Sequence, residues 1–396
     1  MENPKIRFKG FTKDWEQRKF SELYARSSEK NDGSIGMDKN ITVATMQFKN
    51  DVKVSTTEYL KTYYTFKLGD IAFEGHQSKE FRYGRFVEND IGNGIVSHIF
   101  AVFRPIQEYD LYFWKYAINN ETLMQRILAR STKASTMMHD LVTNDFLNEI
   151  FLVPSVKEQK QIGAFLNKLD NIITLHQRKC EQTKKLKKYM LQKMFPRNGA
   201  KVPEIRFDGF TYDWEQRKLN EVAEKICVGF VGTCEKFYTD ESGIPMYRTG
   251  NLNGLSLNRD DLKYVTNEFH QHNQKSQLKA GDILIARHGD SGKAVNYENS
   301  EEANCLNIVI IRPDFKKCNY KFLTNCINSP ECQKHIKSLS AGSTQAVINT
   351  SEIEKLGVVI PANIDEQNRI ARYFSTLDNL ITLHQRQHKL HLNMLL

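Results

Sequence analysis

The chain carries both ends of one unit twice, and this duplication restricts its fold more than any other feature. Residues 4–19 (PKIRFKGFTKDWEQRK) differ from residues 203–218 (PEIRFDGFTYDWEQRK) at three positions only. Residues 169–178 (LDNIITLHQR) match residues 377–386 (LDNLITLHQR) with one exchange, Ile172 for Leu380. Because self-similarity at a long period marks repeated folding units, the sequence predicts two similar domains in tandem.

The interiors of the two units share a skeleton and little else. The shared positions are Gly69-Asp70-Ile71 with Gly281-Asp282-Ile283, Arg104-Pro105 with Arg312-Pro313, and Glu158-Gln159 with Glu366-Gln367. This pattern indicates a common framework around divergent middles.

Periodicity predicts a mixed α/β fold for each interior. The β-branched segments 95–105 and 307–313 are typical of strands that end at a proline. Segments 109–130 and 319–339 are typical of helices, the second with a bend or a start near Pro330.

A single long helix is predicted over residues 157–195, which contain no proline. Apolar and shared positions recur there at the 3-4 spacing of a coiled-coil seam, and the second copy repeats this spacing as far as Met394. Both seams become polar at a histidine, His176 and His384, where a polar residue fixes register. Such a helix is about 58 Å long. The spacing leaves open whether the two helices pack parallel or antiparallel, although a duplication favours an approximate two-fold relation.

Charge indicates a polyanionic partner. The chain has a net charge of +9. Residues 157–197 contain eleven basic and three acidic side chains, so most of the excess lies in one segment. Basic clusters of this kind are typical of nucleic-acid binding, although a lysine-rich helix face also keeps a protein soluble.

Membrane and disulfide-rich classes are not expected. The sequence has no run of 18 apolar residues and does not start like a signal peptide, which indicates a cytoplasmic protein. The seven cysteines form no CxxC pair and are expected to be reduced thiols, with no metal site.

The framework PxIRFxGFTxDWEQRK, the two GDI segments and the repeated LDNxITLHQR helix resemble the specificity subunit of bacterial type I restriction-modification enzymes. The resemblance covers essentially the whole chain. It implies an α/β mixed fold in which two target recognition domains are joined by two long helices that form an antiparallel coiled coil with pseudo-two-fold symmetry. The corresponding boundaries are residues 1–155 and 198–362 for the two recognition domains with a linker before the second, and residues 156–197 and 363–396 for the two helices.

The resemblance also implies function and partners. Each recognition domain would read one half of a bipartite site in double-stranded DNA, and two modification subunits and the restriction subunits would bind the framework. The chain itself would be non-catalytic and without a cofactor, because S-adenosylmethionine, ATP and Mg²⁺ are expected on those partner subunits, where adenine methylation and DNA cleavage take place. No counterpart of residues 189–197 follows the second helix, since Leu396 aligns with Lys188.

Three polar segments in each interior are candidates for DNA contact. They combine glycine, which allows a close backbone approach, with Arg, Lys, His, Gln, Asn, Ser and Thr, which reach base edges or phosphates. In the first interior the candidates are Gln47, Lys49, Gln77, Lys79, Arg82, Arg85, Lys133 and Thr136; in the second they are Arg248, Asn251, Arg287, His288, Ser291, Lys293, Ser343, Thr344 and Gln345.

Independent catalysis is not expected. The segment GDSGKA at 289–294 has two residues between its glycines and an alanine after the lysine, so it fails as a phosphate-binding loop. The alternative to the specificity hypothesis is a coiled-coil scaffold or interaction protein with only non-specific DNA affinity.

Overall fold

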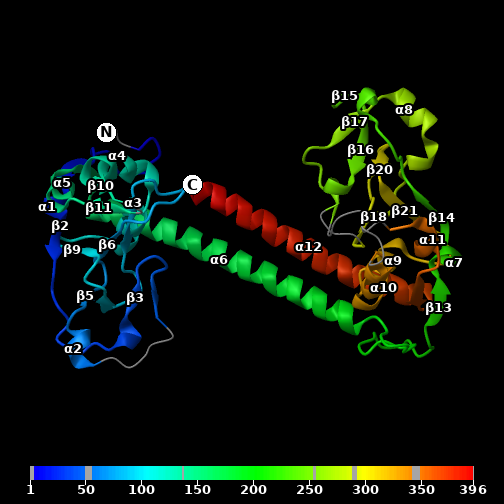
Figure 1. Ribbon diagram of the computed structural model, residues 1–396, viewed down its shortest axis with the longest axis horizontal. Coiled ribbons are helices and arrows are strands. Elements are labelled where there is room, and N and C mark those ends of the chain that lie inside the picture. Colours follow the sequence, from blue (N-terminus) through cyan, green and yellow to red (C-terminus); the bar gives the residue numbers. More distant parts are fainter. Residues whose placement is uncertain are drawn as a thin grey trace. The chain divides into compact units, whose positions relative to one another are not determined.

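The computed structural model describes residues 4–49, 56–135, 138–252, 256–287, 292–340 and 348–395. The chain divides into two compact units, residues 1–174 with 391–396 (unit 1) and residues 175–390 (unit 2). Each unit contains a mixed α/β domain, and a long helix follows each domain in the chain (Figure 1). The first of these helices belongs to unit 1 up to residue 174 and to unit 2 from residue 175.

Unit 1 is built around a four-stranded antiparallel sheet with strand order β2-β9-β6-β7. Four smaller two-stranded sheets accompany it: β1-β12, β3-β4, β5-β8 and the hairpin β10-β11. The strands are β1 (Glu16–Lys19), β2 (Tyr24–Ser27), β3 (Ile41–Thr42), β4 (Gln47–Phe48), β5 (Tyr64–Phe66), β6 (Ile71–Glu74), β7 (Arg85–Glu88), β8 (Gly94–Val96), β9 (Ala101–Pro105), β10 (Thr132–Ala134), β11 (His139–Leu141) and β12 (Ile150–Val153); the helices are α1 (Phe20–Leu23), α2 (Thr57–Leu60), α3 (Leu111–Ile118), α4 (Glu121–Ser131) and α5 (Thr143–Asn148).

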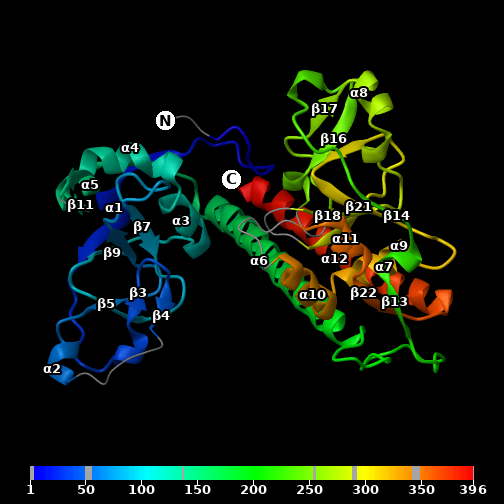
Figure 2. The same cartoon turned by 45° about the vertical axis from the view of Figure 1, so that its right-hand side comes forward.

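Unit 2 repeats this plan and enlarges one part of it. Its sheet β14-β21-β18-β19 has the same antiparallel order as β2-β9-β6-β7, and a second four-stranded sheet, β15-β17-β16-β20, stands where unit 1 has its two short pairs (Figure 2). The strands are β13 (Glu215–Lys218), β14 (Ala223–Val228), β15 (Tyr238–Thr239), β16 (Ile244–Arg248), β17 (Lys263–Val265), β18 (Ile283–Ala286), β19 (Ala294–Asn296), β20 (Asn304–Leu306), β21 (Ile308–Pro313) and β22 (Gly357–Ile360); the helices are α7 (Leu219–Val222), α8 (Asn267–His272), α9 (Tyr320–Ile327), α10 (Pro330–Ser340) and α11 (Thr350–Glu354).

The repeated EQRK segment closes each domain. In unit 1 it is β1, which pairs antiparallel with β12 from Glu16 opposite Val153 to Lys19 opposite Ile150. In unit 2 it is β13, which pairs in the same way with β22. Each domain therefore begins and ends on one two-stranded sheet, and the chain leaves that sheet directly into a long helix.

The repeated Glu-Gln pair fixes each long helix to its domain. Gln159 accepts a hydrogen bond from the backbone N–H of Asp110 at 3.1 Å, and Asp110 caps α3 by accepting from the N–H of Phe113 at 2.8 Å. In unit 2, Gln367 accepts from the N–H of Asn319 at 2.8 Å, and Asn319 caps α9. The start of the long helix is thus tied to the start of an interior helix.

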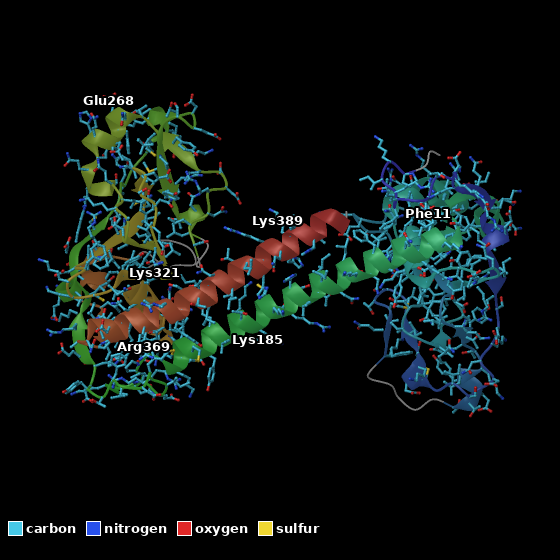
Figure 3. The ribbon with its side chains drawn as sticks, turned by 180° about the vertical axis from the view of Figure 1, so that it is seen from behind. Phe11, Lys185, Glu268, Lys321, Arg369 and Lys389 are labelled. Atoms are coloured by element: carbon cyan, nitrogen blue, oxygen red, sulfur yellow. The ribbon has the colours of Figure 1, made fainter. Side chains whose placement is uncertain are left out.

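The glutamate of that pair binds the arginine of the IRF segment. Nη2 of Arg7 lies 2.7 Å from Oε2 of Glu158, and Nε of Arg206 lies 2.7 Å from Oε1 of Glu366. Both carboxylates are almost fully buried, so each pair is satisfied inside the structure. In unit 2, Arg369 on α12 also lies over the Phe207 ring at 4.9 Å (Figure 3).

The two long helices are α6 (Val156–Lys193) and α12 (Ile364–Leu395). Within unit 2 the second half of α6 packs antiparallel against α12, because residue numbers rise on α6 as they fall on α12. The contacts are His176 with His384, Cys180 with the carbonyl of Ile381, and Lys187 with Asp378. This pairing is the antiparallel coiled coil implied by the family resemblance.

The histidines of the two seams contact each other directly. Their Nδ1 atoms lie 3.2 Å apart and their ring centroids 5.5 Å apart, so one imidazole donates to the other along the line between the rings. Since the two histidines occupy equivalent positions of the repeat, their contact marks the local two-fold relation of the paired helix segments.

Two expectations about element boundaries were wrong. The segment 95–105 is two strands, β8 and β9, because a turn closed by the bond from Phe100 N–H to the Ser97 carbonyl separates them. The segment 109–130 is two helices, because Asn120 caps α4 through its side chain and ends the run of α3. The expectation for segment 319–339 is confirmed, because Pro330 starts a second helix, α10, after α9.

The cores of the two units differ in character. Aromatic rings dominate the core of unit 1, where Phe20, Phe86, Phe103 and Phe146 pack together and Trp114 lies against Tyr24. Aliphatic side chains of β18, β21 and α9 dominate that of unit 2. All seven cysteines are buried free thiols. Within the described part of the chain, no helix carries an apolar run that would fill a bilayer.

Candidate nucleic-acid interface

The loop after β6 and the hairpin β10-β11 lie against each other in unit 1. The N–H of His139 donates to the carbonyl of Gly75 at 2.8 Å, and His76 forms a bridge with Met138. A Cβ at Gly75 would lie 2.1 Å from the carbonyl oxygen of His139, so only glycine allows this approach. Two of the three candidate segments of this interior are therefore neighbours.

Arg85 connects the same loop to the third candidate segment. Its Nε lies 2.9 Å from Oε2 of Glu74, and its Nη2 donates to the carbonyl of Ala44 at 2.7 Å. Its guanidinium also lies 4.9 Å from the centre of the Phe81 ring. The two hydrogen bonds hold the loop to the neighbouring chain segment, and the predicted contact of Arg85 with DNA stays a prediction.

The remaining candidates of unit 1 within the described residues lie on the surface. Their side chains are exposed: Gln47, Lys49, Gln77, Lys79, Arg82 and Lys133. Lys133 lies on β10 opposite Asp140, so an acidic side chain stands beside it. Together these residues give the surface around the loop a polar and mostly basic character.

Unit 2 brings the corresponding two segments together. The N–H of Ile348 donates to the carbonyl of Arg287 at 3.3 Å, and Nε of Arg287 donates to the carbonyl of Ile348 at 3.2 Å. This contact occupies the place of the bond between His139 and Gly75 in unit 1. Lys293 is exposed at the other end of the loop.

Arg248 and Asn251 shape a loop in unit 2. The Asn251 side chain is buried; it accepts from the N–H of Arg248 at 2.8 Å and donates to the carbonyl of Asn258 at 3.1 Å. Nη2 of Arg248 lies 2.9 Å from Oδ2 of Asp261, and the Lys263 and Arg248 cations lower the pKa of that carboxyl. The structure uses both side chains inside the loop, and their predicted DNA contacts stay predictions.

The other predicted contact residues, Thr136, His288, Ser291, Ser343, Thr344 and Gln345, lie outside the described residues. In the part of the chain that is described, no three His, Cys, Asp or Glu side chains gather so that they could hold a metal ion.

Sequence reasoning did not select Tyr83, His139 or Glu121, although all three support the loop in unit 1. The Tyr83 and His139 rings pack edge to face with their centroids 5.4 Å apart, and Glu121 lies near the Arg82 backbone. Burial raises the pKa of Glu121, and the nearby Arg82 backbone opposes the rise. Tyr83 lies between two arginines in the segment FRYGR, and this pattern could have marked it as a functional residue. No local pattern marks His139 or Glu121, which come from distant segments of the sequence.

The chain is similar to known specificity subunits along most of its length. It is 26% identical over 70% of its residues to the type I restriction enzyme MjaVIII specificity subunit of Methanocaldococcus jannaschii. It is 27% identical over 43% of its residues to the putative MjaX specificity subunit of the same organism. The aligned regions span 65% and 40% of the lengths of these relatives, respectively.

The fold is also similar to that of a solved structure, the type I restriction-modification system S subunit from M. genitalium. The TM-score is 0.65 at 15% identity, with coverage of 99% of this chain and 96% of that one. The family profile described as type I restriction modification DNA specificity domain matches twice, at residues 12–185 and 212–393. These two matches take in most of both domains and of both long helices, and the chain belongs to this family of type I restriction-modification DNA specificity proteins.

Proposed function

We propose that this chain is the DNA-specificity subunit of a type I restriction-modification complex, and that its two domains each read one half of a bipartite DNA site. The double match to the specificity-domain family carries this proposal, since each matched region contains most of one domain and of the helix that follows it. The divergent loops on similar frames support it, because two different reading surfaces would give a site with two different halves.

The chain contributes recognition and assembly, and we assign it no catalytic step. Partner subunits supply the chemistry: modification subunits would transfer a methyl group from S-adenosylmethionine to adenine, and restriction subunits would use ATP and Mg²⁺. Double-stranded DNA is the substrate that the chain presents to them. The candidate contact residues lie on loops supported by a rigid sheet, which is where binding side chains are commonly placed.

The paired helices offer a surface for the modification subunits. Leu175, Leu186 and Tyr189 on α6, and Leu383 and Leu390 on α12, are each about half exposed. On each helix these residues lie on one face away from the seam, with exposed polar side chains such as Lys179 and Gln182 between them; we call this set of apolar residues the apolar stripe. Apolar stripes on a helix surface are typical of protein–protein contacts, and we assign this stripe to the modification subunits.

Domain exchange tests the proposal, and the structure sets where to cut. Residues 20–149 lie between β1 and β12, and an exchange at these limits keeps both strands of the closing sheet. Co-expression of the wild-type chain with its modification subunit should methylate one bipartite sequence, measured by methylome sequencing. The exchanged chain should alter one half of that sequence and leave the other half unchanged.

Two outcomes would reject the proposal. If both halves change together, the domains do not read separately. If the wild-type chain binds DNA without sequence preference and supports no site-specific methylation, the chain is a scaffold with general DNA affinity.

A further inference from the structure

Arg82 is an exposed arginine whose side chain lies over an aromatic ring. Its backbone lies near the carboxyl group of Glu121 at the start of α4. Its guanidinium lies over the ring of Tyr83, 5.5 Å from the centroid. Within the described residues its side chain forms no ion pair, unlike the nearby Arg85, which binds Glu74. Its guanidinium donors are therefore available to a ligand.

Tyr83 in turn packs against His139 of the β10-β11 hairpin. Its ring meets the edge of the His139 ring at an interplanar angle of 80°. His139 is 9% exposed, and its Nδ1 lies 3.2 Å from Oγ1 of Thr132 across the hairpin. Its backbone N–H binds the carbonyl of Gly75 at the start of the loop. A continuous stack thus runs from the hairpin through two rings to the guanidinium.

The turn after Tyr83 keeps this stack in place. Gly84 has a φ of +77°, and a Cβ there would lie 2.6 Å from the carbonyl oxygen of Glu74. Only glycine suits this close approach, which returns the chain into β7 at Arg85. The loop therefore has a defined shape at the point where it presents Arg82.

A fixed guanidinium with free donors suits the major-groove edge of guanine. The planar fork of arginine matches the O6 and N7 acceptors of that base, and this pair is the commonest specific contact between proteins and DNA. Because the guanidinium is already held over an aromatic ring, it loses less conformational entropy when it binds a ligand. This favours a contact that depends on the direction of its hydrogen bonds. A phosphate contact requires no such orientation.

We infer that Arg82 reads a guanine in the half-site of the first domain, and that Tyr83 and His139 are positioning residues that orient its guanidinium. This inference rests on the proposed function. It specifies which base is read, which residue reads it and which two residues orient that residue. It assigns no role to the second domain, whose half-site serves as an internal reference.

The test is DNA selection by the full complex of this chain with its modification subunits. Arg82→Ala should reduce discrimination at one G·C pair of the first half-site by about 10-fold or more and leave the second half-site unchanged. Arg82→Lys keeps the charge but not the fork, so it should lose the same discrimination. Arg126→Ala, which removes an exposed arginine of the same domain on α4, should keep full discrimination at every position.

The positioning residues have their own readout. Tyr83→Leu and His139→Ala should weaken discrimination at the same base pair, and Tyr83→Phe should restore it because the ring remains under the guanidinium. The melting temperature of each variant should be measured alongside. Loss of discrimination in Tyr83→Leu with a wild-type melting temperature supports positioning, whereas equal loss in Tyr83→Phe contradicts it.

The failures of this inference and of the proposed function are distinguishable. If Arg82→Ala binds all sequences more weakly by one common factor, Arg82 contacts a phosphate and the inference is overturned. Unchanged selection by Arg82→Ala also overturns it while the function stands. If the wild-type complex selects no bipartite sequence, the proposed function itself has failed.

Discussion

Arg104 of β9 donates two hydrogen bonds to Asp70, the residue before β6: Nε to Oδ1 at 3.0 Å and Nη2 to Oδ2 at 2.9 Å. Arg312 and Asp282 repeat this pair in unit 2, with both distances 2.7 Å. Both carboxylates are buried, and each also accepts from a backbone N–H three residues before it. The pair is the physical reason why GDI and RP recur in both interiors.

We therefore expect Arg104→Ala to destabilise unit 1. The substitution leaves a buried carboxylate without its cation, which should lower the free energy of unfolding of this unit by about 3 kcal/mol. Amide hydrogen exchange in peptides of β6 and β9 measures the effect separately from unit 2. Arg130→Ala, at an ion pair whose arginine is largely exposed, is the matched control and should cost below about 1 kcal/mol. Equal effects in the two variants would contradict a special role for the buried pair.

The framework was predictable because its contacts join residues that both copies share. Each shared motif makes a contact with another shared motif: the Arg of IRF with the Glu of Glu-Gln, and the Asp of GDI with the Arg of RP. Aligning the two halves of the sequence with each other therefore identifies these residues directly. The pairing of His176 with His384 follows from the same repeat, whereas the antiparallel direction of the helices does not, because a parallel pair would place the same residues opposite each other.

Element boundaries and side-chain roles in the interiors were less predictable. Arg85 and the carbonyl of Ala44 are 41 residues apart in sequence, and nothing local indicates that they meet. Asn251 resembles a surface amide in sequence, yet its loop folds around it and uses its hydrogen bonds. Tyr83 and His139 come from separate segments, so their stack is a property of the fold alone.

Glu88 predicts a dependence of stability on pH. It is 3% exposed on β7, and burial, with Asp90 as a further contributor, raises its pKa well above the ordinary value. When the pKa of a carboxyl is higher in the folded state than in the unfolded state, the folded state becomes less stable as the pH rises above the unfolded pKa of about 4.5. Above that pH the folded state must either keep the proton or bury the charge.

We therefore expect Glu88→Gln to raise the melting temperature of unit 1 at pH 8 and to change it little at pH 4. The gain should grow with pH from about 4.5 upward until the pH passes the folded pKa. Glu80→Gln, at an exposed position of the same unit, is the control and should shift the melting temperature little at either pH. A gain from Glu88→Gln that is the same at pH 4 and pH 8 would exclude ionisation as its cause.

The lysines of the cluster at 184–188 have different surroundings. Nζ of Lys187 lies 2.6 Å from Oδ1 of Asp378 across the helix pair, whereas Lys185 is exposed on α6 (Figure 3). Lys187→Ala should weaken the helix pairing by about 1 kcal/mol, because the ion pair is partly shielded from water. Hydrogen exchange in α12 peptides measures this change. Lys185→Ala should leave exchange in α12 unchanged, and a shared response of both variants would indicate a general effect of charge.

The apolar stripe predicts how the modification subunits are held. Leu175→Glu places a charge on the exposed stripe, and burying that charge against a partner is unfavourable, so co-purification with the modification subunit should fall by about 10-fold or more. Gln177→Glu introduces the same charge two residues along α6, about 200° around the helix, and should leave co-purification at the wild-type level. Leu383→Glu, the equivalent change on α12, should act like Leu175→Glu. Far-ultraviolet circular dichroism checks that all three variants keep their helices. If both leucine variants still co-purify with the modification subunit, the docking surface lies outside the stripe. The assignment of the recognition domains does not depend on this result.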